Sequence, residues 1–167
     1  MSGQTDRHGL PLLAAGQAQK EVSHNEALLA IDGLLHAAVE AVGLTTPPVA
    51  PEPGQAWIVG AGATGAWAGQ DGALALHTVG GWRFFAARAG MLAWLPAESV
   101  FVRHDGSQWL AGDWPVAQLR VDGQRVVGAR RPAITGPAGG GVVDTQARDI
   151  IEAILSALRA HGLIDAA

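Results

Sequence analysis

All six tryptophans of the chain lie between residues 54 and 114, and glycine stands shortly before five of them. Glycine allows the positive φ angles of tight turns, whereas tryptophan favours strands and carries a large apolar surface. A turn residue followed by a large aromatic, repeated along the chain, predicts a small antiparallel sheet domain, either a β-meander or a barrel. Both ends of the chain lack tryptophan and have helical patterns, so the predicted fold class is α+β.

Seven short strands are predicted in this stretch, and a further pair follows it. Three dipeptides, Asp71-Gly72, Gly80-Gly81 and Asp105-Gly106, have the composition of hairpin turns. The predicted strands are 56–60, 65–69, 73–79, 82–87, 91–95, 100–104 and 108–110, and 116–121 is expected to pair with 124–127.

Ahead of the sheet, an irregular arm over residues 1–15 precedes a predicted helix that ends at Gly43. The helix starts either at Ser23, which forms a capping box with Glu26, or earlier, near Gln17. Apolar residues recur along it at spacings of three and four, which places them on one face. We expect this face to pack on a partner chain as well as on the chain's own sheet. Its predicted interface residues are Leu28, Ile31 and Leu35, and the face continues to Ala38 and Val42.

A second helix is predicted from Thr145 to about His161, with Asp144 as its N-cap and Gly162 as its C-terminal stop. Four apolar residues along it are spaced by four, three and four, which is a short heptad seam. Isoleucine at both seam positions favours three helices around one axis, so a homotrimer is the preferred assembly. The alternative is that this helix packs on the chain's own sheet. The seam residues are Ala147, Ile151, Ile154 and Leu158.

Proline and glycine divide the chain into five predicted parts. Four prolines in residues 45–54 indicate a stiff extended linker, and a Gly/Pro-rich stretch gives a second one. The parts are an N-terminal arm and assembly helix (1–44), the proline-rich linker (45–54), an antiparallel β domain (55–128), a Gly/Pro-rich linker (129–142) and a C-terminal oligomerisation helix (143–167).

Composition points away from several classes of partner. The net charge of −4 argues against a nucleic-acid partner, which favours a basic face, and no apolar run is long enough for membrane insertion. The absence of cysteine excludes thiolate metal sites and disulfides. The six histidines lack metal-ligand spacing, so we expect no metal and no other cofactor. The polar N-terminus has no secretion signal, which predicts a protein made in the cytoplasm.

Two weaker signals favour structural roles over catalysis. Residues 60–65 match the glycine spacing of a dinucleotide-binding loop, but turn and strand patterns follow instead of the required helix. The acidic residues Asp71, Asp105 and Asp113 lie where turns are expected, and the sequence does not pair them across a cleft. We therefore predict that the chain is not an enzyme.

Two segments have specific residue patterns, GQAQKEVSHNEAL (16–28) and IVGAGATGAWAG (58–69), and a third segment spans residues 126–164. All three resemble a domain family without assigned chemistry, found in prophages and in the phage-like gene transfer agents of alphaproteobacteria. The first two are specific, and the third, from 126 to 164, looks like a recurrent tail of those proteins. The resemblance covers nearly the whole chain and implies a particle component of a tail fibre, baseplate or head spike, with no catalytic residues to carry over.

The leading hypothesis is therefore a homo-oligomeric structural component of a phage-like particle, or virion, that supports attachment to the host cell surface. Its expected partners are copies of itself and other structural proteins of the particle. The alternative is a carbohydrate-binding module that contacts capsule or lipopolysaccharide through exposed tryptophans. Trp67 and Trp109 are the predicted glycan contacts, because each lies beside a glycine turn where a ring can face outward.

Overall fold

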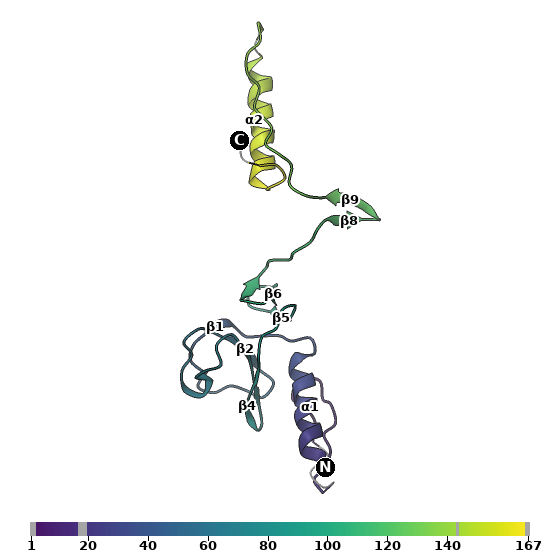
Figure 1. The fold of residues 1–167 in the computed structure, drawn as a ribbon, viewed down its shortest axis with the longest axis vertical. Coiled ribbons are helices and arrows are strands. Elements are labelled where there is room, and N and C mark those ends of the chain that lie inside the picture. Colours follow the sequence, from purple (N-terminus) through teal and green to yellow (C-terminus); the bar gives the residue numbers. More distant parts are fainter. Residues whose placement is uncertain (1–2, 17–19, 143, 166–167) are drawn as a thin grey trace. The chain divides into compact units, whose positions relative to one another are not determined.

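The computed structural model describes residues 3–16, 20–142 and 144–165, and the chain divides into two compact units (Figure 1). Unit 1 is Met1–Trp114 and unit 2 is Pro115–Ala167. Each unit joins a helix to antiparallel strands, which confirms the predicted α+β class. The division differs from the five predicted parts, since the arm, the first helix and residues 45–54 all belong to the same unit as the tryptophan-rich strands.

Unit 1 contains two open sheets built from strands that follow one another along the chain, as in a meander. The first has the order β1-β2-β3-β4 and the second the order β5-β6-β7. All pairs are antiparallel except β1 with β2, which is parallel and was not predicted. The elements are α1 (Lys20–Leu34), β1 (Val42–Leu44), β2 (Ala56–Val59), η1 (Gly65–Trp67), β3 (Leu74–Thr78), β4 (Gly81–Phe85), β5 (Leu92–Leu95), β6 (Val100–His104) and β7 (Trp109–Ala111).

Strand β2 of the first sheet is buried on both of its faces. Neighbouring residues of a strand point to opposite sides. On one side, Ala56 and Ile58 of β2 join a core that also includes residues of β5 and β6. On the other side, Trp57 and Val59 pack in a cluster with Trp67. All four residues of β2 are consequently buried.

The predicted strand at residues 65–69 is wrong, because this segment forms the 3-10 helix η1. Gly65 and Gly69 on either side both have positive φ, so the chain turns tightly and directs Trp67 into the cluster. The ring of Trp67 lies 6.2 Å from Trp57 and 5.1 Å from Trp82, centroid to centroid.

Helix α1 ends at Leu34, well before the predicted stop at Gly43. His36 adopts a positive φ, and the backbone then extends so that Val39 donates a hydrogen bond to the Trp94 carbonyl of β5. The pairing with β5 thus replaces the predicted last turns of the helix. Ser23 lies inside the helix, so the start predicted there is wrong. The other predicted start, Gln17, lies outside the described residues.

The N-terminal arm is fixed by a buried carboxylate of α1. Asp32, which is almost fully buried, accepts hydrogen bonds from the Thr5 hydroxyl and from the backbone N–H groups of Arg7 and His8. The Arg7 guanidinium donates to the carbonyls of Gly33 and His36, which satisfies acceptors left open at the helix end. The arm and α1 are therefore one packed structure.

Unit 2 contains the hairpin of β8 (Leu119–Val121) and β9 (Gln124–Val127) and the helix α2 (Thr145–Ala160). The hairpin turn is at Asp122-Gly123, as predicted, and both residues have positive φ, which suits the right-handed twist of a two-residue loop. All seven strand residues are exposed to solvent.

Candidate functional site

The boundaries of α2 agree with the predicted caps. The Asp144 carboxylate accepts a hydrogen bond from the backbone N–H of Ala147 at 3.0 Å, which satisfies one of the free donors of the first turn. At the other end Gly162 has a φ of +67°, and Leu163 N–H donates to the Leu158 carbonyl at 2.9 Å. This bond closes the helix end in the way that a left-handed cap residue allows.

One face of α2 is covered by the chain's own Gly/Pro-rich segment, residues 129–142. Arg159 donates to the Ile134 carbonyl at 2.7 Å, and Arg148 donates to the carbonyls of Pro137 and Gly139. Leu155 lies between these two arginines on the same side of the helix and is 5% exposed. The segment predicted as a linker is therefore attached along the helix.

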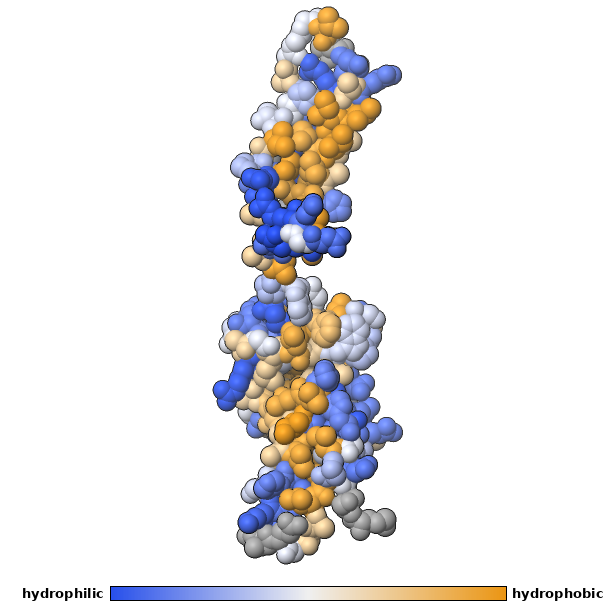
Figure 2. Space-filling model, turned by 90° about the vertical axis from the view of Figure 1, so that its right-hand side faces the viewer, coloured by the Kyte–Doolittle hydropathy of each residue, from blue (hydrophilic) through white to orange (hydrophobic). Residues whose placement is uncertain are grey.

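The predicted seam of α2 lies on a different side and is largely uncovered. Ile151 is 43% exposed and Ile154 is 54% exposed, whereas Leu158 is half-buried and Ala147 is exposed. Ile150, beside the seam, is also exposed, and Figure 2 shows apolar side chains gathered along this helix. Within unit 2, the seam residues are therefore open to solvent.

The predicted interface of α1 is only partly a helical face. Leu28 is half-buried and Ile31 is exposed, but Leu35 lies beyond the last residue of the helix. The buried side of α1 instead contains Asp32 and Gly33, and a Cβ atom on Gly33 would lie 2.8 Å from the Leu76 side chain. The absence of a side chain there lets α1 pack closely on the first sheet.

The prediction that Trp67 contacts glycan is wrong, because its side chain is 0% exposed and sits in the aromatic cluster of unit 1. The adjacent glycine turn points this ring inward. Trp109 is half-buried, and its indole N–H donates to the Gly72 carbonyl at 2.8 Å. Its ring borders a pocket of about 360 Å³ whose other lining residues include Asp71, His104, Ser107 and Gln108. Whether Trp109 contacts a ligand stays a prediction.

A group of aromatic rings, two of them exposed and one half-buried, lies elsewhere, on the outward side of the β5-β6-β7 sheet. Trp94 of β5 stands directly opposite Phe101 of β6, with ring centroids 5.0 Å apart, and Trp114 lies 6.0 Å from Phe101. Phe101 is 50% exposed and Trp114 is 55% exposed. We call Trp94, Phe101 and Trp114 the aromatic face. The alternation of strand side chains places Trp94 and Phe101 on one side, although neither was among the predicted site residues.

An ion pair flanks the aromatic face. The Arg103 guanidinium donates to the Asp113 carboxylate at 2.7 Å and, more weakly, to the Asp113 carbonyl at 3.5 Å. Arg103 lies on the same strand as Phe101 two residues on, so both point outward. The pair ties the segment that carries Trp114 to the sheet.

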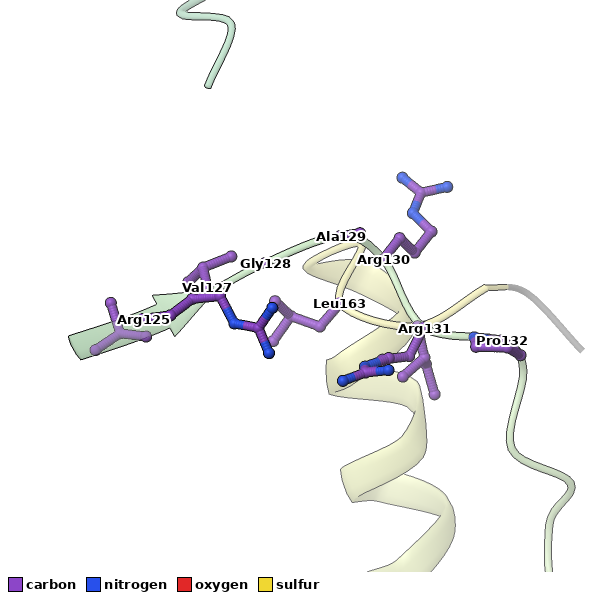
Figure 3. Close-up of a pocket in the computed structure, with 10 residues that line it drawn as sticks. Arg125, Val127, Gly128, Ala129, Arg130, Arg131, Pro132 and Leu163 are labelled. Atoms are coloured by element: carbon purple, nitrogen blue, oxygen red, sulfur yellow. The ribbon is translucent and has the colours of Figure 1, made fainter. Parts of the chain in front are cut away.

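Unit 2 has a pocket of about 500 Å³ beside the C-terminal end of α2 (Figure 3). Arg125 and Arg131 lie on either side of Leu163 in this view, while the Arg130 side chain is directed away from them. Arg130 donates to the Gly162 carbonyl at 3.0 Å and lies 3.9 Å from the Asp165 carboxylate. The pocket is basic, but its arginines are exposed to water.

Two of the predicted turn-forming carboxylates hold loops together. The backbone N–H groups of Gln108 and Ser107, followed by the Ser107 hydroxyl, lower the pKa of Asp105 from 3.8 to about 2. The backbone N–H groups of Gly62 and Ala63 lower the pKa of Asp71. The latter bonds hold the glycine-rich loop at residues 60–65, which leads into the short η1 and not into an α-helix.

Two kinds of feature are absent from the described part of the chain. Residues 3–16, 20–142 and 144–165 contain no cluster of three or more histidine, aspartate or glutamate side chains that could hold a metal ion. Over the same ranges, neither α-helix has the length and apolar character needed to cross a bilayer.

The structure thus defines an α+β protein with a closed tryptophan-rich unit and a second unit that carries an uncovered apolar helix face. The chain matches the family described as a protein of unknown function, DUF2793, over residues 24–110, just over half of its length, and it belongs to that family. The match covers most of unit 1. No curated protein matches the chain.

Proposed function

We propose that the chain is a non-enzymatic structural component of a phage or gene-transfer-agent particle, which assembles as a homo-oligomer and supports attachment to the host cell. The uncovered seam of α2 is the observation that carries the self-association. An apolar stripe with Ile151 at 43% and Ile154 at 54% exposure is costly in water, and burial between subunits removes that cost.

The seam favours sister copies of the same helix as its cover. Spacings of four, three and four keep the seam residues facing one axis when helices supercoil, and isoleucine at both kinds of position favours three helices. The Gly/Pro-rich segment occupies a neighbouring side of α2, so it leaves the seam free for partner helices. A trimer is therefore the proposed assembly.

The place in a particle is supported by the resemblance of three segments to proteins of prophages and gene transfer agents. Other structural proteins of the particle are the proposed neighbours, and the proposed location is the assembled particle after synthesis in the bacterial cytoplasm. Tail fibre, baseplate and head spike all fit a self-associating helix joined to a separate compact unit.

The substitution Ile154→Asp tests the self-association. It would place a carboxylate at the centre of the seam, near two copies of itself, where desolvation and repulsion both oppose assembly. Sedimentation should give the mass of a single chain for this variant and a multiple of it for the wild type. Ser156→Asp is the matched control, since Ser156 is exposed and lies about 200° around the helix axis from Ile154. Equal masses for Ile154→Asp and the wild type would reject the seam as the interface.

A carbohydrate-binding module is the second candidate. This function was predicted from Trp67 and Trp109, and the burial of Trp67 removes one of these two contacts. The exposed rings of the aromatic face favour the same function independently. The two functions are compatible in one chain, because the seam belongs to unit 2 and the aromatic face to unit 1.

A further inference from the structure

We propose that the aromatic face of Trp94, Phe101 and Trp114 binds a segment of cell-surface polysaccharide by stacking its rings on sugar rings. The proposal rests on the second candidate function and gives it a site different from both predicted tryptophans. The ligand class is a chain of pyranose sugars, whose C–H faces are apolar and whose rims carry hydroxyl groups.

Folding alone does not account for these exposed rings. The inward side of the same sheet already supplies Ala93, Leu95 and Val102 to the core, and each is at most 3% exposed. The outward side of such a sheet ordinarily carries polar residues facing water. Aromatic residues at Trp94 and Phe101 expose a surface that the core does not use.

The rings are held in place before any ligand arrives. Trp94 and Phe101 meet edge to face at 66°, which is a favoured arrangement for aromatic pairs, and Trp114 is tilted by 54° from Phe101. The bond between Arg103 and Asp113 fixes the residue just before Trp114. The rings thus form an angled surface in which a sugar can lie on one ring and touch the edge of the next.

The size of the exposed surface fits a glycan better than a protein. Half of a large aromatic side chain is on the order of 100 Å², so the two most exposed rings offer roughly 200 Å². A stable protein interface needs about 800 Å² on each partner. A few sugar units match the smaller area.

The ion pair beside the rings supplies polar groups without net charge. Asp113 uses its Oδ2 atom for Arg103, and no other hydrogen bond to its carboxylate is present within the described residues. Its Oδ1 atom can accept a hydrogen bond from a sugar hydroxyl. A charge-balanced flank favours the uncharged part of a polysaccharide over a densely acidic one.

The test is a calorimetric titration of the full-length protein with purified alphaproteobacterial capsular polysaccharide and, separately, with delipidated lipopolysaccharide. Dextran is the control polymer. We expect the wild type to bind at least one of the two bacterial polymers. Trp114→Ala and Phe101→Ala should each weaken that binding by roughly tenfold or more, a change of about 1.4 kcal/mol. Trp114→Phe, which keeps a ring, should retain most of it.

Controls separate this site from the other candidates. Trp109→Phe and Arg131→Gln, at the two pockets described above, should bind like the wild type. These two variants and those of the aromatic face should keep the sedimentation mass of the wild type. The proposal is overturned if the wild type binds neither polymer, or if Trp114→Ala and Phe101→Ala both bind normally. It is also overturned if Trp114→Ala lowers the mass, since the face would then be a subunit contact. Ile154→Asp should still bind polysaccharide at the aromatic face of each chain. Glycan binding can therefore be tested even if the protein does not form a trimer.

Discussion

The two units solve the problem of burying apolar surface differently. Unit 1 surrounds β2 and β3 with side chains on both faces, and Trp67, Leu74 and Ala75 are completely buried within it. In the described residues of unit 2, Leu155 and Ile164 are the buried apolar side chains, while three isoleucines of α2 are exposed. Unit 1 therefore has a core of its own, and unit 2 has an apolar surface without a cover.

Because of this difference, we expect the stability of unit 2, but not that of unit 1, to depend on assembly. Hydrophobic burial is the main favourable term in folding, so a unit with a closed core is stable at any protein concentration. A unit that completes its core between subunits gains stability as concentration rises, because association is linked to folding. The tryptophans allow the two to be measured separately, since all six lie in unit 1.

The largest expected effect is that of Trp67→Ala. Removing this buried ring should destabilise unit 1 by about 3–5 kcal/mol, the usual cost for a core aromatic. Urea unfolding followed by tryptophan emission measures the change. Trp114→Ala, which removes an exposed ring of the same type, should cost less than about 1 kcal/mol. Equal losses for the two variants would break the distinction between core and surface within unit 1.

A smaller effect is expected for Leu155→Ala in unit 2. Leu155 is held beneath the Gly/Pro-rich segment, and its truncation should cost about 2–3 kcal/mol, at the low end for leucine because the surrounding core is thin. The midpoint of helix loss, monitored by circular dichroism, should move to milder denaturing conditions. The unfolding transition monitored by tryptophan emission should stay as in the wild type. Val142→Ala, at an exposed apolar position, is the matched control. A shift of both signals together would show that the units unfold as one.

Removal of the helix cap should have a still smaller effect. Asp144→Ala deletes the acceptor for the Ala147 N–H and should cost about 1 kcal/mol. The same dichroism signal measures it. Asp144→Asn and Asp144→Ser preserve a capping oxygen, so both should stay close to the wild type; if they lose as much as alanine, the cap does not contribute.

The smallest expected effect is the change with pH in the contribution of Asp105 to the stability of unit 1. The folded-state pKa of Asp105 is about 2, and its ordinary pKa is 3.8. The ionised carboxylate therefore stabilises the fold at pH values above the ordinary pKa, and this stability is lost as the pH falls through the folded-state pKa. The melting temperature of unit 1 should exceed that of Asp105→Asn at pH 5, and the gap should narrow as the pH falls towards about 2 and close below it. Asp149→Asn, in unit 2, serves as the control. A gap that is constant with pH would mean that the Asp105 charge has no part in the turn.

Local patterns explain which elements could be predicted from the sequence. The Asp144 cap, the Gly162 stop and the Asp122-Gly123 turn depend on residues near one another, and each is present as predicted. The end of α1 was missed because Ala37 to Val39 pair with β5, more than fifty residues away, and this pairing overrides the helical pattern. The parallel pairing of β1 with β2 has the same origin, since no turn signals it.

Part of the candidate site could be predicted from the sequence. The seam of α2 follows from periodicity alone, and the structure adds that the Gly/Pro-rich segment covers a different side. The inward turn of Trp67 depends on the glycine conformations around it, and an outward direction could not be read from a glycine neighbour. Trp94 and Phe101 could have been grouped, because alternation along β5 and β6 fixes which side they face once the register is known.

The central claim is that unit 2 completes its apolar surface through copies of itself, and the mass of the wild-type protein in solution tests it most directly. Sedimentation equilibrium over a wide concentration range should give a mass near three times the 17.1 kDa of one chain at high concentration. On dilution the mass should fall, together with the helix signal of α2, while tryptophan emission stays constant. A mass of one chain at every concentration, with α2 fully helical, would contradict the account.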